Sequence, residues 1–291
     1  MQVAIRDASL YQAGYASAVE GLLDLGLAAI ELAIDRDGYV RSLEDELQLN
    51  LTDPAHRNAL EEQMERHGVR VCTLLCSQDF HHPEEREAHV HWVTQAAQVA
   101  EILGIPSLRV DSIMTGQAEL PLPERVRIFA EGLREVLRGT PDSTVELGIE
   151  NHGPQGNDPE WMLAVLGEVD NPRVGVTLDV GNWYWFGHPL SRVYQIYREL
   201  GPHVKATHVK NIAYPEELRE TQREVGYEYG RYCCPLDEGD LEMAKVVAIL
   251  REAGYDGPLT IEDESIGKVA ESKRREVLKR DAEHLRAVLT G

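Results

Sequence analysis

Eight strand-like segments alternate with segments of helical periodicity along the whole chain. Alternation of this regularity is typical of parallel βαβ units. Eight such units in 291 residues favour a closed (β/α)₈ barrel, which commonly takes about 250 residues or more. We therefore predict an α/β fold with one barrel domain over 1–291. The predicted strands cover 3–7, 28–35, 70–77, 107–113, 145–152, 174–182, 204–212 and 259–265.

Helices are expected between these strands, and two of them carry clear start signals. Thr52-Asp53-Pro54 and Asp158-Pro159 each place a capping side chain before a proline, which suits the first helical turn. The segment 213–238 is long for a loop of a barrel and is expected to lie over its mouth. The expected helices cover 15–27, 54–67, 83–104 with Pro83 as its start, 123–138, a stretch from 159, 190–200, 240–253 and a last helix to about 289.

An open doubly wound sheet is the competing fold. Such sheets usually carry a glycine-rich phosphate-binding turn after the first strand. Here the first strand is followed by RDASLYQAGY, which lacks G-x-G-x-x-G, and the chain has no G-x-x-x-x-G-K-[ST] motif. The barrel is therefore the preferred fold, and a phosphate-binding loop is not evident in the sequence.

Composition limits the partners and the compartment. Asp and Glu number 50 against 29 Lys and Arg, and the resulting net charge of −21 disfavours nucleic acid and anionic membranes as partners. The N-terminal segment lacks a signal peptide, and no run of about 18 apolar residues indicates a membrane helix. The four cysteines show no spacing that suits a disulfide. We expect a reduced, cytoplasmic protein, with homo-oligomerisation as an open possibility.

Four predicted strands in the second half of the chain end in residue types that bind metal ions. These residues are Glu150, Asp179, His208 and Glu262. Glu150 and Asp179 are 29 residues apart, as are Asp179 and His208, which matches the length of one strand–helix unit. The carboxyl ends of barrel strands meet at the catalytic rim, and three carboxylates with one imidazole suit a hard or borderline divalent ion. The pattern predicts a metal enzyme.

The ordered set of motifs resembles the xylose isomerase-like TIM barrel superfamily, specifically its sugar phosphate isomerase/epimerase family. The matching motifs are IENHG, TLDVGN, THVKN, PLDEGD and GYDGPLTIEDE. The resemblance implies that Glu150, Asp179, His208 and Glu262 bind one divalent ion. Mn²⁺ is the expected ion, with Mg²⁺, Co²⁺ and Zn²⁺ as alternatives. The resemblance also implies that Glu150 and Glu262 are the catalytic acid/base residues on opposite faces of a bound ketose.

The implied activity is that of a metal-dependent isomerase or epimerase acting on a small sugar or polyol-derived substrate. Proton abstraction beside a carbonyl creates an enediolate, which a divalent ion stabilises while one carboxylate removes the proton and a second group returns it. Loss of a β-hydroxyl instead would give a lyase of the inosose-dehydratase or dehydroshikimate-dehydratase type. This lyase is the alternative that the sequence leaves open.

Several residues near the four predicted ligands are candidates for substrate contact. His152 lies two residues after Glu150 and Lys210 two after His208, so each can share a side of the strand with its ligand. Asn182 stands where several related ketose epimerases have a histidine that contacts substrate. These three are the predicted substrate-binding residues. Further candidates are Glu31, Arg109 and Asp111 as rim residues or members of barrel-end salt bridges, Trp183, Trp185 and Phe186 as an apolar wall or loop packing, and His81-His82 as a second metal site.

Two other functions are less well supported. Related apurinic endonucleases bind three metal ions and require further histidines, but Asn182 occupies one of the positions and no histidine occurs between His208 and Glu262. The acidic charge also disfavours DNA as a substrate. A non-catalytic binding subunit would not need to keep both Glu150 and Glu262.

Overall fold

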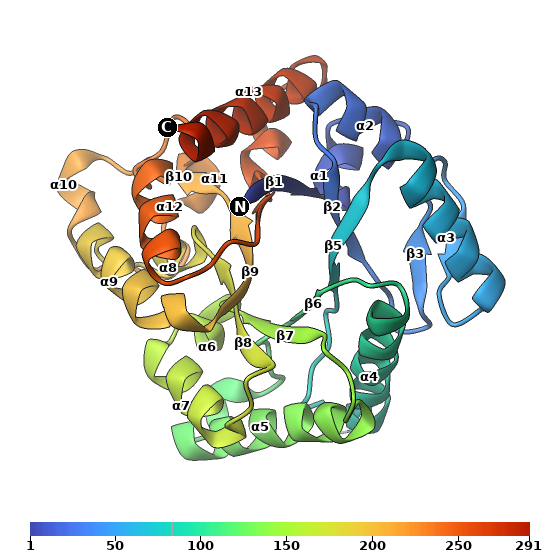
Figure 1. Cartoon of the computed structure of the whole chain (residues 1–291). Coiled ribbons are helices and arrows are strands. Elements are labelled where there is room, and N and C mark those ends of the chain that lie inside the picture. Colours follow the sequence, from blue (N-terminus) through green and yellow to red (C-terminus); the bar gives the residue numbers. More distant parts are fainter. Residues whose placement is uncertain (83) are drawn as a thin grey trace.

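Eight parallel strands close into a barrel, and helices surround it on the outside (Figure 1). This computed structural model describes residues 1–82 and 84–291. Around the barrel the strands follow the order β1-β12-β9-β8-β7-β6-β5-β2. They are Gln2–Arg6 (β1), Ala29–Ala33 (β2), Arg70–Leu75 (β5), Ser107–Val110 (β6), Glu146–Glu150 (β7), Val174–Asp179 (β8), Val204–Val209 (β9) and Pro258–Ile261 (β12). The predicted (β/α)₈ barrel and its eight strands are confirmed.

The outer layer consists of helices that run back between successive strands. The helices are Asp7–Gln12 (α1), Ala18–Leu25 (α2), Pro54–His67 (α3), Arg86–Ile102 (α4), Leu122–Gly139 (α5), Gly153–Gly156 (α6), Pro159–Val169 (α7), Asn182–Trp185 (α8), Leu190–Leu200 (α9), Glu216–Arg219 (α10), Tyr229–Tyr232 (α11), Met243–Glu252 (α12) and Glu271–Thr290 (α13). Short 3₁₀ helices cover Gln117–Glu119, Gly201–His203 and Glu264–Lys268 (η3). Among the described residues, no helix combines the length and the apolarity that a membrane span would require.

The two predicted helix starts carry the expected caps. The Asp53 side chain accepts a hydrogen bond from Ala55 N, and Pro54 occupies the first turn of α3. Asp158 accepts from Glu160 N at the start of α7 in the same way. Each carboxylate satisfies a backbone donor that would otherwise lack a partner within the helix. The capping residues thus set where these two helices begin.

The first quarter of the chain differs from the prediction in detail. The expected helix at 15–27 is shorter, because Ser17 caps it by accepting from Glu20 N, and a separate helix α1 follows β1 directly. The acidic connection before α3 contains an unpredicted antiparallel hairpin of Tyr39–Arg41 (β3) and Gln48–Asn50 (β4). Pro83, the predicted start of the next helix, lies outside the described residues, and α4 begins at Arg86.

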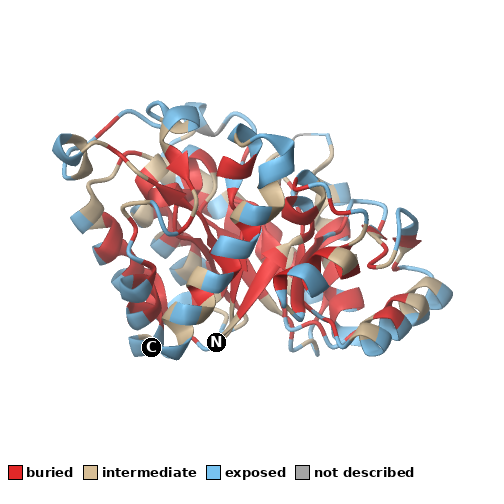
Figure 2. Cartoon of the chain, turned by 90° about the horizontal axis from the view of Figure 1, so that it is seen from above, coloured by how far each residue is buried: buried red, intermediate tan, exposed pale blue. Residues whose placement is uncertain are grey.

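The hydrophobic core lies between the strands and the inner faces of the helices, as the burial colours of Figure 2 show. Helix α5 illustrates the pattern: its buried residues recur at three- and four-residue spacing, which keeps them on one face toward the barrel. They are Val126, Phe129, Ala130, Gly132, Leu133 and Val136. Apolar burial of this extent is the main stabilising contribution to the fold. Because this core supplies the main stabilisation, polar residues can stand at the carboxyl ends of the strands.

The long segment 213–238 folds back on itself at the catalytic side of the barrel. Asn211–Ile212 (β10) pairs antiparallel with Cys233–Cys234 (β11), so both ends of the segment are joined. The Arg223 guanidinium donates to Tyr184 O and lies 4.4 Å from the ring centroid of Tyr214, which fixes the middle of the segment on the barrel. The prediction that this segment covers the mouth is confirmed by Tyr229, which lines the cavity described below.

Candidate metal and substrate site

The four predicted ligand residues come together at the carboxyl ends of four neighbouring strands. Glu150 and Asp179 are the last residues of β7 and β8, His208 is the next to last of β9, and Glu262 follows β12. Asp179 is in register with His208, and Glu262 N donates to Val209 O, so the parallel pairing aligns these strand ends. One ligand atom from each residue lies within 4.8 Å of the others.

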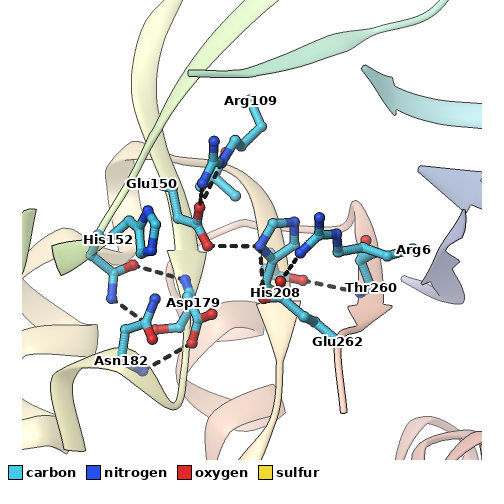
Figure 3. Close-up of polar contacts among 12 residues, drawn as sticks. Arg6, Arg109, Glu150, His152, Asp179, Asn182, His208, Thr260 and Glu262 are labelled. Atoms are coloured by element: carbon cyan, nitrogen blue, oxygen red, sulfur yellow. Dashed lines mark hydrogen bonds and ion pairs between the residues drawn. The ribbon is translucent and has the colours of Figure 1, made fainter. Parts of the chain in front are cut away.

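His208 is the centre of this cluster and is fully buried. Its Nδ1 lies 2.8 Å from Glu150 Oε1 and 3.3 Å from Glu262 Oε2 (Figure 3). Its Nε2 lies 2.9 Å from Glu31 Oε1 on the opposite side of the ring. Burial acts to lower the pKa of His208, but the negative charges of Glu31 and Glu150 outweigh it and raise the pKa to about 9. A bound metal ion would require the neutral ring, so metal binding would release this proton.

Glu150 is held by a buried arginine from the neighbouring strand β6. Arg109 Nε donates to Glu150 Oε2 at 2.5 Å, and its Nη1 donates to Cys76 O and Asp111 Oδ2. Burial acts to raise the pKa of Glu150, but the charges of Arg109 and His208 hold it well below its usual range. Glu150 is therefore an ionised carboxylate with one oxygen fixed by Arg109 and the other turned toward His208.

Asp179 is positioned by backbone contacts. Its Oδ1 accepts hydrogen bonds from Gly181 N and Asn182 N. The side-chain amide of Asn151 donates from Nδ2 to Asp179 O and accepts at Oδ1 from Asp179 N. Burial raises the pKa of Asp179 against the opposing charge of Lys210. Lys210 Nζ lies 2.9 Å from Asp179 Oδ2 in an ion pair. The loop after β8 thus fixes one oxygen of Asp179 and leaves the other facing the cluster.

Arg6 from β1 contacts Glu262, the fourth of the predicted ligand residues. The Arg6 guanidinium donates to Glu262 Oε1, and Figure 3 shows this contact on the side of Glu262 away from Asp179. Glu262 Oε2 is buried and accepts no hydrogen bond from the described residues, although Lys210 Nζ lies 3.5 Å away. Arg6 was not among the sequence candidates, although it is the next-to-last residue of the predicted strand 3–7, close enough to the strand end for the same argument to find it.

The residues present fit a divalent ion. Three carboxylates and one imidazole offer the oxygen and nitrogen donors that such an ion prefers. Glu262 Oε2 is buried and accepts no hydrogen bond from any residue that the structure describes, which leaves it as an acceptor for a cation, whereas Asp179 Oδ2 already faces the Lys210 ammonium at 2.9 Å. Glu31 on His208 and Arg109 on Glu150 supply the outer contacts that typically orient metal ligands.

A cavity of about 180 Å³ opens beside the ligand cluster. The predicted substrate-binding residues His152, Asn182 and Lys210 all line it. His152 Nδ1 lies 3.1 Å from Asp111 Oδ1, and this hydrogen bond raises the pKa of His152 against the effect of burial. Asn182 is buried, and Lys210 donates to Glu264 at 2.5 Å. The remaining lining residues are Trp185, Tyr229 and Glu264.

Two of these lining residues were not found from the sequence. Glu264 lies two residues beyond Glu262, which is the offset that drew attention to His152 and Lys210, so the same reasoning applied there would have found it. Tyr229 comes from α11 within the long segment, and no spacing pattern connects it with the strand ends. Its place depends on how the segment folds over the barrel.

The further candidates from the sequence lie partly around the ligand cluster and partly away from it. Glu31, Arg109 and Asp111 form the barrel-end ion pairs described above. Trp183 is fully buried, whereas Trp185 lines the cavity and Phe186 packs near His188. His81 contacts Thr115 O and His82 Nδ1 accepts from Glu85 N. Among the described residues the ligand cluster includes neither histidine, so the second metal site at His81-His82 has no support.

The family model for the xylose isomerase-like TIM barrel matches residues 19–288. The chain therefore belongs to the xylose isomerase-like TIM barrel family. An uncharacterized protein of Methanocaldococcus jannaschii is 28% identical over 152 residues, which cover 50% of this chain and 46% of that protein. The match thus spans less than half the length of this curated relative.

Solved structures share the fold over nearly the whole chain at low identity. The IolI protein with a bound zinc atom has a TM-score of 0.73 at 15% identity, covering 98% of each chain. A D-tagatose 3-epimerase-like protein has a TM-score of 0.68 at 20% identity, covering 99% of this chain and 100% of its own. The probable 3-DHS dehydratase AsbF of Bacillus anthracis has a TM-score of 0.67 at 17% identity, covering 100% and 99%.

Proposed function

We propose that this member of the xylose isomerase-like TIM barrel family is a divalent-metal-dependent isomerase or epimerase acting on a small sugar or polyol derivative. The observation that carries the proposal is the convergence of Glu150, Asp179, His208 and Glu262 within 4.8 Å, beside a polar cavity. The similarity to a D-tagatose 3-epimerase-like protein supports this class of reaction, and the zinc atom bound to the similar IolI protein supports a divalent ion. Mn²⁺ is the proposed ion, held by these four residues.

The divalent ion, when bound, supplies positive charge against the negative charge that develops on a substrate carbonyl oxygen. The chain's own residues move the protons. Glu150 is the proposed base: it is ionised, and Arg109 holds its carboxylate in place, so an acceptor for the proton on the carbon beside the carbonyl is already positioned. Glu262 follows β12, which flanks β9 on the side away from β8, and it returns a proton to the substrate. Return to the opposite face of the same carbon gives epimerisation, and return to the neighbouring carbon gives isomerisation.

Lyase chemistry is the second candidate, and His152 is the observation that favours it. His152 lines the cavity, and the Asp111 carboxylate raises its pKa, so it is suited to protonate a departing hydroxyl group. The similar structure titled as a probable dehydratase supports keeping this alternative. Loss of water would yield a product with a conjugated chromophore.

Metal content and isotope exchange together test the proposal. Purified protein is expected to hold about one divalent ion per chain by elemental mass spectrometry, and the Glu150→Gln, Asp179→Asn double variant is expected to lose it. The Mn²⁺-loaded protein, incubated with a panel of ketoses and inososes in D₂O, is expected to exchange one carbon-bound proton without losing water. Glu262→Gln should abolish the exchange and keep the fold.

Each alternative gives a different result in the same experiment. An ultraviolet-absorbing product with release of water would identify a lyase. Two or three ions per chain would revive the nuclease hypothesis. Absence of bound metal after addition of Mn²⁺ or Co²⁺ would refute the proposed metal enzyme.

A further inference from the structure

Part of the cavity wall beside the ligand cluster is built from three residues on separate elements. Lys210 follows β9, Glu264 begins η3 after β12, and Tyr229 belongs to α11 in the segment over the mouth. We call Lys210, Glu264 and Tyr229 the cavity wall. All three line the same cavity as His152, Asn182 and Trp185. Because they come from the residues that follow strand ends and from the covering segment, they are the groups that a substrate would meet on entry.

The positive charge of Lys210 is already matched by carboxylates. Its Nζ donates to Glu264 Oε1 at 2.5 Å and lies 2.9 Å from Asp179 Oδ2 and 3.5 Å from Glu262 Oε2. An ammonium group has three donor hydrogens, and three carboxylates surround this one. Glu264 therefore prevents Lys210 from acting as a free cation toward an anionic substrate.

The other basic side chains near the cavity are also paired with carboxylates. His152 faces Asp111, while Arg6 and Arg109 contact Glu262 and Glu150. Among the described residues that line the cavity, no cation lacks a carboxylate partner. A phosphate monoester placed here would meet the Glu264 carboxylate, and juxtaposed like charges cost several kcal/mol. An ion held by Asp179 and Glu262 would engage those two carboxylates, but Glu264 lies outside the ligand cluster, and its charge disfavours a phosphate group in the cavity.

The uncharged polar atoms of the cavity suit hydroxyl groups. Asn182 Nδ2 and Tyr229 Oη are buried, and neither makes a hydrogen bond of ordinary geometry with a described residue; the polar group next to Tyr229 Oη is the Glu264 carboxylate. A buried polar group without a partner is costly, so a ligand that hydrogen-bonds both groups would recover this energy. Trp185 adds an aromatic face for the carbon-bound hydrogens of a ring. The volume of about 180 Å³ lies below the range of about 300–1,000 Å³ for drug-sized ligands, which indicates a small molecule.

We infer that the cavity wall selects a neutral, polyhydroxylated small molecule and excludes phosphate esters, with Glu264 as the residue that sets this preference. This inference rests on the proposed function, since it concerns the substrate of the same site. It also specifies the substrate class that the sequence left open, because a resemblance to a sugar phosphate family does not decide whether the substrate carries a phosphate.

Calorimetric binding to the Mn²⁺-loaded full chain tests the inference. The probes are D-fructose, D-tagatose and D-psicose, each compared with its 6-phosphate. The wild-type protein is expected to bind at least one free ketose at least about tenfold more tightly than its phosphate, in keeping with the cost of juxtaposed like charges. Glu264→Gln should reduce the ratio of the phosphate ester's Kd to the free ketose's Kd several-fold, because it removes the cavity carboxylate that repels a phosphate and one of the partners of Lys210. The exposed Glu217 provides the matched control, and Glu217→Gln should leave the ratio unchanged.

A second variant tests the hydroxyl contact without changing a charge. Tyr229→Phe is expected to weaken binding of the free ketose by about tenfold, which corresponds to one hydrogen bond, while metal content stays at the wild-type value. Tyr39→Phe, at an exposed tyrosine of the β3–β4 hairpin, is the control. Thermal unfolding of each variant checks that the fold is intact.

The outcomes separate this inference from the proposed function. Preference for the phosphate esters, an unchanged ratio in Glu264→Gln, or no binding of either class would overturn the inference. Turnover of a phosphate ester would leave the isomerase proposal standing and refute only the substrate class. Selective binding of free ketoses without any proton exchange or loss of water would support the inference about the ligand and refute the enzyme.

Discussion

The Glu31 carboxylate lies 2.9 Å from His208 Nε2, although 177 residues separate the two in the chain. Both side chains are buried, with Glu31 on β2 and His208 on β9. A carboxylate on one ring nitrogen fixes the orientation and tautomer of a histidine, so that the other nitrogen is free to bind a metal ion. In this protein the free nitrogen is Nδ1, which faces Glu150 and Glu262.

Loss of this contact is expected to weaken metal binding. Glu31→Gln keeps the size of the side chain but removes the charge that orients His208, and such outer contacts typically contribute 10- to 100-fold to metal affinity. Equilibrium dialysis with Mn²⁺ measures the change. Glu61→Gln, at an exposed position of α3, is the control and should bind Mn²⁺ like the wild type. Equal affinities in all three proteins would show that Glu31 does not position His208.

Arg109 is expected to be essential for stability. Arg109→Met would leave the carboxylates of Glu150 and Asp111 buried without their shared cation, which typically costs about 3–5 kcal/mol. Chemical denaturation in a chelator measures the free energy of unfolding without a contribution from metal. Arg127→Met removes an exposed arginine paired with Glu131 and should cost less than about 1 kcal/mol. Similar losses in both variants would contradict the assigned role of Arg109.

A buried pair of carboxyl groups predicts a pH dependence of stability. Asp281 on α13 lies against Asp263, and burial together with that neighbouring charge raises the pKa of Asp281 to about 9. The folded state therefore binds a proton that the unfolded state, with a pKa near 3.8, releases. The stabilisation is fully present below about pH 4 and is lost as the pH rises toward 9.

The variant Asp281→Asn should remove most of this pH dependence. The amide oxygen can still accept from Leu236 N, as Asp281 Oδ1 does, while the ionisable group is gone. At pH 8 the variant is expected to be more stable than the wild type by about 1–3 kcal/mol, the typical cost of a poorly satisfied buried polar group. Denaturant titrations from pH 5 to pH 9 give the slope of the free energy of unfolding against pH for the wild type and for the variant. Parallel slopes would show that Asp281 does not carry the buried proton.

Gly181 is expected to be required for the position of Lys210. A Cβ atom at Gly181 would lie 2.4 Å from Lys210 Cγ, although its φ of −81° suits any residue. Gly181→Ala should therefore destabilise the protein by about 1–3 kcal/mol through overpacking. Gly167→Ala, on α7 with no atom within 4 Å of the added Cβ, should stabilise by about 0.5–1 kcal/mol. Thermal and chemical unfolding of both variants tests this contrast.

Much of the barrel could be predicted because each unit carries its own signals. The strand that ends at Glu150 is a short apolar run, and Asp158-Pro159 marks the helix that follows it. The β3–β4 hairpin was missed, since short strands in an acidic connection bury few side chains and show little periodicity. Helix α1 was missed because it follows β1 without an intervening turn.

The residues that stand at the strand ends can be read from the chain alone. Glu150, Asp179 and His208 recur at an interval of one strand–helix unit, so any closed barrel of these units brings them to the same rim. Their residue types also determine the donor set that a metal ion would meet. These properties depend on local patterns and on the repeat length, which are readable along the chain.

The charged groups that contact these predicted ligand residues follow from the three-dimensional fold and not from the chain's pattern. Arg6 reaches Glu262 because β1 and β12 are neighbours when the barrel closes, although the two residues are 256 positions apart. Tyr229 and Glu264 line one cavity because the segment over the mouth folds onto the end of β12. Such contacts depend on closure of the barrel and on side-chain packing across it, and a linear pattern contains neither.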